Sequence, residues 1–292
     1  MRKLVAFVLM TGLIPAIASA QQETAPAANE GVSDDQVVVT GPRDQSREVR
    51  ARHVTAIAST VDGQMPRFHD PVCPRIFGLP AAYAERVSTR IREVVNEAGV
   101  ATAEPGCAAN LVVILTPDPD AAMADLQRRI PTIFDGVPPD ERRLALRPGA
   151  ERVWQPVQIR NEDGARIRGG VLDVRSASFI NEPTVYAAVG AWMVLDGDAI
   201  VGRTLVQLAD YIAMRLVAGA RVPAAGTGID TILTLLRTDG GPQTITQGDR
   251  AYMQALYATR PNRRSTLQMG DIVREMGKKP KDRRRAPLTR RL

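Results

Sequence analysis

Histidine is scarce in this sequence, and its scarcity restricts the metal chemistry that the chain can perform. The 292 residues include two histidines, His53 and His69. A zinc hydrolase normally binds its ion through three protein side chains. The two cysteines, Cys73 and Cys107, have no CxxC or HxxH pairing that would complete a zinc site. We therefore expect neither a metal site nor a cofactor.

Aromatic residues are also few, at 4% of the chain, with two tryptophans and five phenylalanines. Proteins that bind single-stranded nucleic acid stack the bases on aromatic side chains that lie among positive charges. The basic residues near the C-terminus have no aromatic residues interleaved with them. We therefore expect no nucleic acid partner.

The short motifs of common hydrolases and nucleotide-binding proteins are missing. No G-x-S-x-G elbow is present. The glycines at 169–170, 226–228 and 240–241 are isolated, and they fit neither a Walker A loop nor a dinucleotide-binding fingerprint. His69 and Asp70 remain as the one adjacent pair that could act as a base and its orienting carboxylate.

Each histidine also has a structural interpretation. His69 lies in the stretch FHDPVC, where it would donate a hydrogen bond to a backbone carbonyl beside a disulfide. His53 lies on an expected helix, where we expect a partly exposed side chain.

The N-terminus has the pattern of a secretory signal peptide. Arg2 and Lys3 precede an apolar stretch, and Ala18 and Ala20 have the small side chains of a cleavage site before Gln21. A retained membrane anchor is the alternative, but the apolar run is shorter than the roughly 20 residues of a spanning helix. We expect a periplasmic or secreted protein.

An exported chain with two cysteines is expected to form a disulfide, here between Cys73 and Cys107. Closing a loop of this length would stabilise the fold by about 3–4 kcal/mol. Two free thiols are the alternative. Because an expected helix separates the cysteines, the loop before that helix would have to fold back along it.

The formal net charge of +6 is unevenly distributed. Residues 1–20 account for +2 and residues 272–292 for +7, which leaves −3 for the rest of the chain. We expect a disordered basic tail over residues 278–292 that could bind anionic lipid or lipopolysaccharide, since each basic residue near such a surface contributes about 1 kcal/mol. Its candidate contacts are Lys278, Lys279, Lys281, Arg283, Arg284, Arg285, Arg290 and Arg291.

The pattern of apolar residues predicts one globular domain over residues 45–277, after a flexible segment over residues 21–44. Apolar residues at a spacing of three and four predict a helix over 81–99, closed by Gly99. The β-branched run 110–116 predicts a buried strand, and the proline-rich residues 64–80 predict an irregular loop. We expect an α+β fold with antiparallel strands and packed helices, with a mixed α/β arrangement as the alternative.

The remaining elements follow from similar patterns. Asp118 and Asp120 would open one helix and Asp198 would cap another, which makes these aspartates turn and cap residues rather than calcium ligands. Residues 230–236 fit either a strand or a short helix. The other expected elements are helices at 45–62, 198–219, 248–259 and 265–277 (the last capped by Ser265), a hairpin around 161–164, and one long strand at 184–196.

The stretch ITQGDRAYMQALYATRPN resembles the closing helix of zincin-type peptidases. Its matching positions are Thr246, Asp249, Met253, Leu256 and Tyr257. Where that family has its metal-binding histidines and glutamate, this chain has Gln207, Leu208 and Tyr211. The resemblance covers the last third of the chain and implies a metal-free relative of these peptidases. The alternative is an amphipathic core helix unrelated to them.

Two further resemblances concern location and partners. Stretches such as RFHDPVCP and LADYIAMR are similar to those of uncharacterised exported alphaproteobacterial proteins, which implies location alone. Residues 37–41, VVVTG, are similar to a segment near the start of many TonB-dependent receptors. That resemblance implies that Val37, Val38, Val39 and Thr40 pair as a strand with a periplasmic protein. A strand of this protein's own sheet is the alternative.

These patterns favour a non-enzymatic protein of the cell envelope, a binding or scaffolding module. The alternative is a hydrolase, either a degenerate zincin-like one or one based on His69 and Asp70.

Overall fold

Four strands form the larger of two sheets in the computed structural model, which describes residues 46–167, 169, 180–237 and 241–278. The strand order is β2-β3-β7-β4. Strands β2 (Pro74–Phe77), β3 (Leu111–Thr116) and β7 (Ala191–Asp196) run parallel to one another. Strand β4 (Glu151–Trp154) is antiparallel to β7. The sheet is therefore mixed, and the domain combines parallel and antiparallel strands with packed helices.

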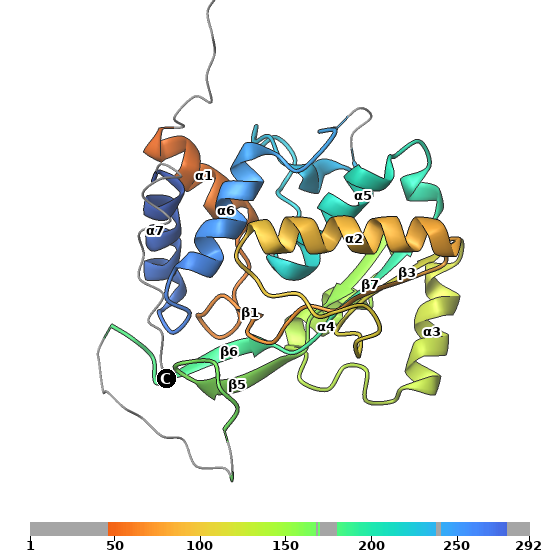
Figure 1. The fold of residues 1–292 in the computed structure, drawn as a ribbon, viewed down its shortest axis with the longest axis horizontal. Coiled ribbons are helices and arrows are strands. Elements are labelled where there is room, and N and C mark those ends of the chain that lie inside the picture. Colours follow the sequence, from red (N-terminus) through yellow and green to blue (C-terminus); the bar gives the residue numbers. More distant parts are fainter. Residues whose placement is uncertain (1–45, 168, 170–179, 238–240, 279–292) are drawn as a thin grey trace, which may run out of the picture. The chain divides into compact units, whose positions relative to one another are not determined.

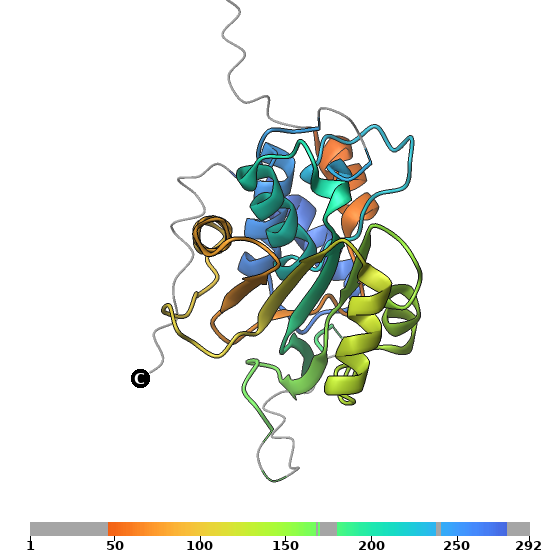
Figure 2. The same ribbon diagram turned by 90° about the vertical axis from the view of Figure 1, so that its right-hand side faces the viewer.

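Helices cover both faces of this sheet (Figures 1 and 2). Helices α2 (Ala81–Glu97) and α5 (Leu205–Ile212) lie on one face, and α3 (Pro119–Arg129) and α4 (Pro139–Ala145) lie on the other. Successive residues of a strand point to opposite faces. In β3, Leu111, Val113 and Leu115 therefore join the main core, whereas Ile114 packs with the smaller cluster under α3 and α4.

The second sheet has the order β1-β6-β5 among the described residues. Strand β1 (Arg67–Phe68) is parallel to β6 (Thr184–Ala188), and β5 (Val157–Asn161) is antiparallel to it. Beside this sheet, α1 (Arg47–Ile57), α6 (Gln247–Ala258) and α7 (Ser265–Met276) pack against one another (Figure 1). The first and last described helices are therefore neighbours.

The disulfide between Cys73 and Cys107 is confirmed, with the two Cα atoms 6.2 Å apart. The expected irregular loop over 64–80 is wrong, because it contains β1 and β2. Pro74 occupies the first position of an edge strand, where its missing N–H removes no ladder bond. Since β2 and β3 are parallel neighbours, the two cysteines lie near the starts of both, and no loop has to fold back along α2.

The expected strand over 184–196 is two strands in different sheets. It breaks at Val189 and Gly190, where the N–H of Val189 donates to the carbonyl of Pro156. Both halves are buried, so the apolar pattern continues across the break. The expected hairpin around 161–164 is also different. Strand β5 pairs with β6, and the contacts across the turn include an isolated bridge between Arg160 and Arg166 and hydrogen bonds between Asn161 and Ala165.

The helix expected over 198–219 begins later. Asp198 starts a single 3-10 turn, and Thr204 caps α5 in a reciprocal arrangement with Gln207. The chain continues from α5 into a π-helical turn, Ala213–Val217. Residues Ile232–Thr234 form a 3-10 turn, which resolves the ambiguous segment 230–236. Ser265 is the first residue of α7 and does not cap it.

Other local expectations are confirmed. Helix α2 ends at Glu97, and Gly99 follows with a positive φ of 82°, which glycine adopts without strain. Asp118 caps α3 by accepting a hydrogen bond from Ala121 N at 2.9 Å. No described helix combines the length and the apolar character needed to cross a bilayer.

Candidate functional site

The carboxylate of Asp70 is held by arginine side chains, and it makes no described hydrogen bond to His69. Its two oxygens accept hydrogen bonds from Arg160 at 3.1 and 2.6 Å, and a third from Arg166 at 3.4 Å. Hydrogen bonding from Arg160 holds the pKa of Asp70 below its ordinary value. The structure therefore does not join His69 and Asp70 as a base and its orienting carboxylate.

His69 is half-buried between β1 and the turn that contains Gly164. A Cβ atom at Gly164 would overlap the imidazole, so the ring lies directly on the glycine. Burial lowers the pKa of His69 to about 4, and the positive charges of Arg67 and Arg160 act in the same direction. The Nε2 atom is buried and makes no hydrogen bond within the described part of the chain, so the expected bond to a carbonyl is not made through this atom.

The α5 positions that resemble a metal-binding helix have structural roles. Gln207 belongs to the cap of α5 and donates to the carbonyl of Pro242 at 2.9 Å. Leu208 is buried in the core, and Tyr211 donates its hydroxyl hydrogen to Glu151 at 2.7 Å. Burial raises the pKa of Tyr211, and the charge of Glu151 raises it further. In the described ranges, no three His, Cys, Asp or Glu side chains are grouped to hold a metal ion.

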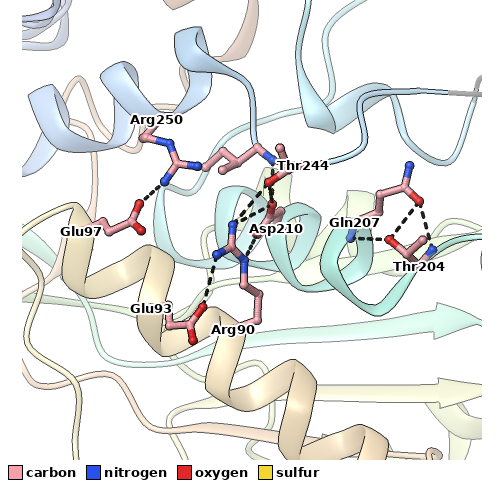
Figure 3. A network of polar contacts seen from close by, with 9 residues as sticks. Arg90, Glu93, Glu97, Thr204, Gln207, Asp210, Thr244 and Arg250 are labelled. Atoms are coloured by element: carbon pink, nitrogen blue, oxygen red, sulfur yellow. Dashed lines mark hydrogen bonds and ion pairs between the residues drawn. The ribbon is translucent and has the colours of Figure 1, made fainter.

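A buried carboxylate on α5, Asp210, was not identified from the sequence. It accepts hydrogen bonds from Arg90 at 2.8 and 3.3 Å, from the Thr244 hydroxyl at 2.6 Å and from Ile245 N at 2.6 Å (Figure 3). A buried charge is strongly unfavourable unless it is paired and hydrogen-bonded. Asp210 therefore links α2, α5 and the segment before α6, and its acceptor sites are used within the protein.

His53 differs from the expectation of a partly exposed residue, because its side chain is buried. Its Nε2 atom lies 3.2 Å from Oδ1 of Asp249, and the two side chains are 4% and 0% exposed. The geometry at Nε2 is outside that of a hydrogen bond, so the contact is an ion pair or a dipolar contact. The other oxygen of Asp249 accepts from Ile232 N at 2.7 Å and from Thr246 N at 3.4 Å. These bonds fix the carboxylate beside the imidazole.

The two partners are far apart in the sequence, and neither lies in a motif that predicts the other. Asp249 also occupies a position that matched the zincin-type closing helix. It closes the reciprocal cap of α6 with Thr246 and contacts His53 on α1.

A hollow of about 310 Å³ lies in front of this pair. It is bounded by α1, by the segment before the 3-10 turn at Ile232 and by the first turn of α6. Its lining residues are Val49, Arg52, His53, Gly228, Ile229, Asp230, Thr246, Gln247 and Gly248. Of the titratable groups in this lining, His53 is the buried one, while Arg52 and Asp230 are exposed.

The other predicted site residues lie mostly outside the described part of the chain. These are the signal peptide, the strand residues 37–40 and the basic residues from 279 onward. Lys278 is described, and its ammonium group pairs with Glu275 at 2.6 Å.

Comparison of the chain with protein-family models, curated proteins and solved structures gives no match. The residues of the site therefore carry the functional argument.

Proposed function

We propose that this chain is an exported, non-enzymatic protein of the cell envelope that acts as a binding or scaffolding module. The observation that carries the proposal is the pairing of Asp70 with Arg160 and Arg166. A carboxylate held by two arginines does not orient a histidine, and a histidine with a pKa of about 4 is a weak base at neutral pH. The one adjacent acid/base pair of the sequence is therefore used for structure.

The surroundings of α5 support the same proposal. The buried carboxylate of α5 itself is Asp210, and its oxygens accept four hydrogen bonds from the protein. Such a group has little capacity left to bind a metal ion or activate a water molecule. We propose that a relationship to those peptidases would make this chain a metal-free relative that keeps their fold without their metal site.

Two partners belong to the proposal. Residues 37–41 would add a strand to a periplasmic protein of the TonB type, and the tail from residue 278 would bind anionic lipid or lipopolysaccharide. Titration with the periplasmic domain of such a transducer should shift the amide resonances of residues 36–41. A chain that ends at Gly277 should lose binding to anionic liposomes.

The proposal of a non-enzymatic protein is tested with the mature protein purified from the periplasm. Hydrolysis of casein and of p-nitrophenyl acetate is measured for this protein and for the His69→Ala variant. We expect both to stay at the background rate, and we expect elemental analysis to find no stoichiometric transition metal. A rate above background that disappears in the variant would favour the hydrolase alternative, and recovery of the chain with its N-terminus intact in the cytoplasm would contradict export.

A further inference from the structure

We propose that the hollow between α1 and the first turn of α6 binds the carboxylate group of a small ligand. This inference rests on the proposed role as a binding module and assigns a site and a ligand chemistry to it. The volume of about 310 Å³ corresponds to about ten water molecules at the volume that each occupies in the liquid. The hollow therefore suits a short acid or the C-terminal end of a peptide.

The first turn of α6 supplies two donors to the hollow. The first backbone N–H groups of a helix have no partner within the helix. Here the Thr246 side chain accepts from Asp249 N, and the bond from Arg250 N to Thr246 O begins the helical series. The N–H groups of Gln247 and Gly248 remain without a protein partner in the described structure, and both residues line the hollow. The positive end of the helix dipole also favours an anion here.

His53 supplies a third, independent contact from α1. Its side chain is 96% buried, yet the residue lines the hollow. Nε2 faces Asp249 without making a hydrogen bond in the described structure, so the Nδ1–Cε1 edge of the ring is the part that borders the hollow. The edge of the ring that carries Nδ1 and Cε1 lies against Gly248, since a Cβ there would be 2.9 Å from Cε1 and 3.1 Å from Nδ1. The absence of a side chain at Gly248 thus brings the imidazole close to the donors of α6.

The charges around the hollow suit one carboxylate and not a multiply charged anion. Asp249 lies behind His53, and Asp230 at the rim is opposite in sign to Arg52 at the rim. A phosphate with two negative charges would meet both aspartates. A single carboxylate would use the two N–H groups and His53, with Arg52 near the entrance.

The test compares two probes that differ at one group. Tri-alanine with a free C-terminus and tri-alanine amide are titrated into the isotope-labelled protein, and amide and imidazole resonances are followed by NMR. We expect the acid to shift the signals of Gln247, Gly248 and His53, and the amide to leave them unchanged. Acetate, a free acid without a peptide chain, distinguishes recognition of any carboxylate from recognition of a chain terminus, and inorganic phosphate should bind more weakly than acetate.

Variants localise the binding. The change His53→Gln keeps a donor toward Asp249 but removes the imidazole, and it should weaken binding of the acid about tenfold. Arg52→Ala should weaken it about threefold, in line with an exposed charge. Arg47→Ala removes an exposed arginine of the same helix outside the lining and serves as the control with unchanged binding. If His53→Gln does not fold, the binding of the acid to Arg52→Ala and the resonance shifts of the wild-type protein still test the carboxylate site.

Equal shifts with the acid and the amide, or shifts confined to residues outside the lining, would overturn the carboxylate site and leave the proposed function intact. The same spectra also detect free alanine. Its release from tri-alanine would contradict the non-enzymatic proposal, whatever the location of the binding site.

Discussion

Arg90 of α2 donates two hydrogen bonds to the fully buried carboxylate of Asp210 on α5. Removing one member of a buried ion pair leaves the other charge without its partner. We expect Arg90→Ala to lower the free energy of unfolding by about 3 kcal/mol, as measured by urea denaturation. Glu93→Ala is the matched control, because Glu93 is an exposed partner of the same arginine. Its effect should stay within about 0.5 kcal/mol, and equal effects of the two variants would contradict the role of Asp210.

The low pKa of His69 predicts how stability depends on pH. Its pKa is about 4 in the folded protein and about 6.5 when the chain is unfolded. Between these values the unfolded chain binds more protons, so stability falls as the pH decreases from 6.5 to 4 and then levels off. The partial exposure of His69 to solvent reduces the effect, and we expect this residue to lower the free energy of unfolding by about 2 kcal/mol over this pH range. The free energy of unfolding in urea should differ less between pH 7.5 and pH 4.5 for His69→Gln than for the wild type. An equal difference for the two proteins would contradict the role of His69 in the pH dependence.

The disulfide joins two segments that start neighbouring parallel strands. Without it, the unfolded chain regains the entropy of an open loop. We expect the double variant Cys73→Ala, Cys107→Ala to lose about 3–4 kcal/mol of stability in urea denaturation under oxidising conditions. Adding a reductant should destabilise the wild type by a similar amount and leave the double variant unchanged. A reductant effect on the variant would point to another cause.

Gly164 and Gly63 form a natural pair for measuring the contact between His69 and the turn beneath it. Both have φ near 77°, so alanine at either site takes a left-handed conformation that costs about 1 kcal/mol. A Cβ at Gly63 meets nothing within 4 Å, whereas one at Gly164 overlaps His69. We expect Gly164→Ala to lower the melting temperature by several degrees more than Gly63→Ala. Adding His69→Ala to the first variant should remove much of the difference.

Local signals in the sequence predicted the elements that local chemistry determines. The spacing of apolar residues and Gly99 predicted α2, and the β-branched run predicted β3, because burial and capping act within a few residues. The pattern did not predict β2, since Pro74 and Pro80 indicate irregular chain unless it is known that the strand lies at a sheet edge. It also did not divide 184–196, because both strands are buried and so continue a single apolar run.

The site residues were harder to predict, because their partners come from distant parts of the chain. Nothing near His53 indicates that Asp249 lies beside it, and nothing near Asp70 indicates Arg160. Asp210 lies in a stretch of α5, residues 207–212, in which every residue is buried, so an apolar stripe alone did not reveal a buried charge. A charged residue within a strongly apolar helix is nevertheless a signal, since burial requires a partner for it.

The packing of α1 against α7 has a consequence for how the molecule is made. A chain that crosses a membrane from its N-terminus presents α1 first, while the helix that covers its apolar side is still on the other side. Arg50 of α1 donates to the carbonyl of Val273, so under the proposed export this contact would form only after nearly the whole domain had crossed the membrane. Under the same proposal, a nascent chain stopped before α7 would lack the helix that packs against α1 and would leave α1 available to chaperones and proteases.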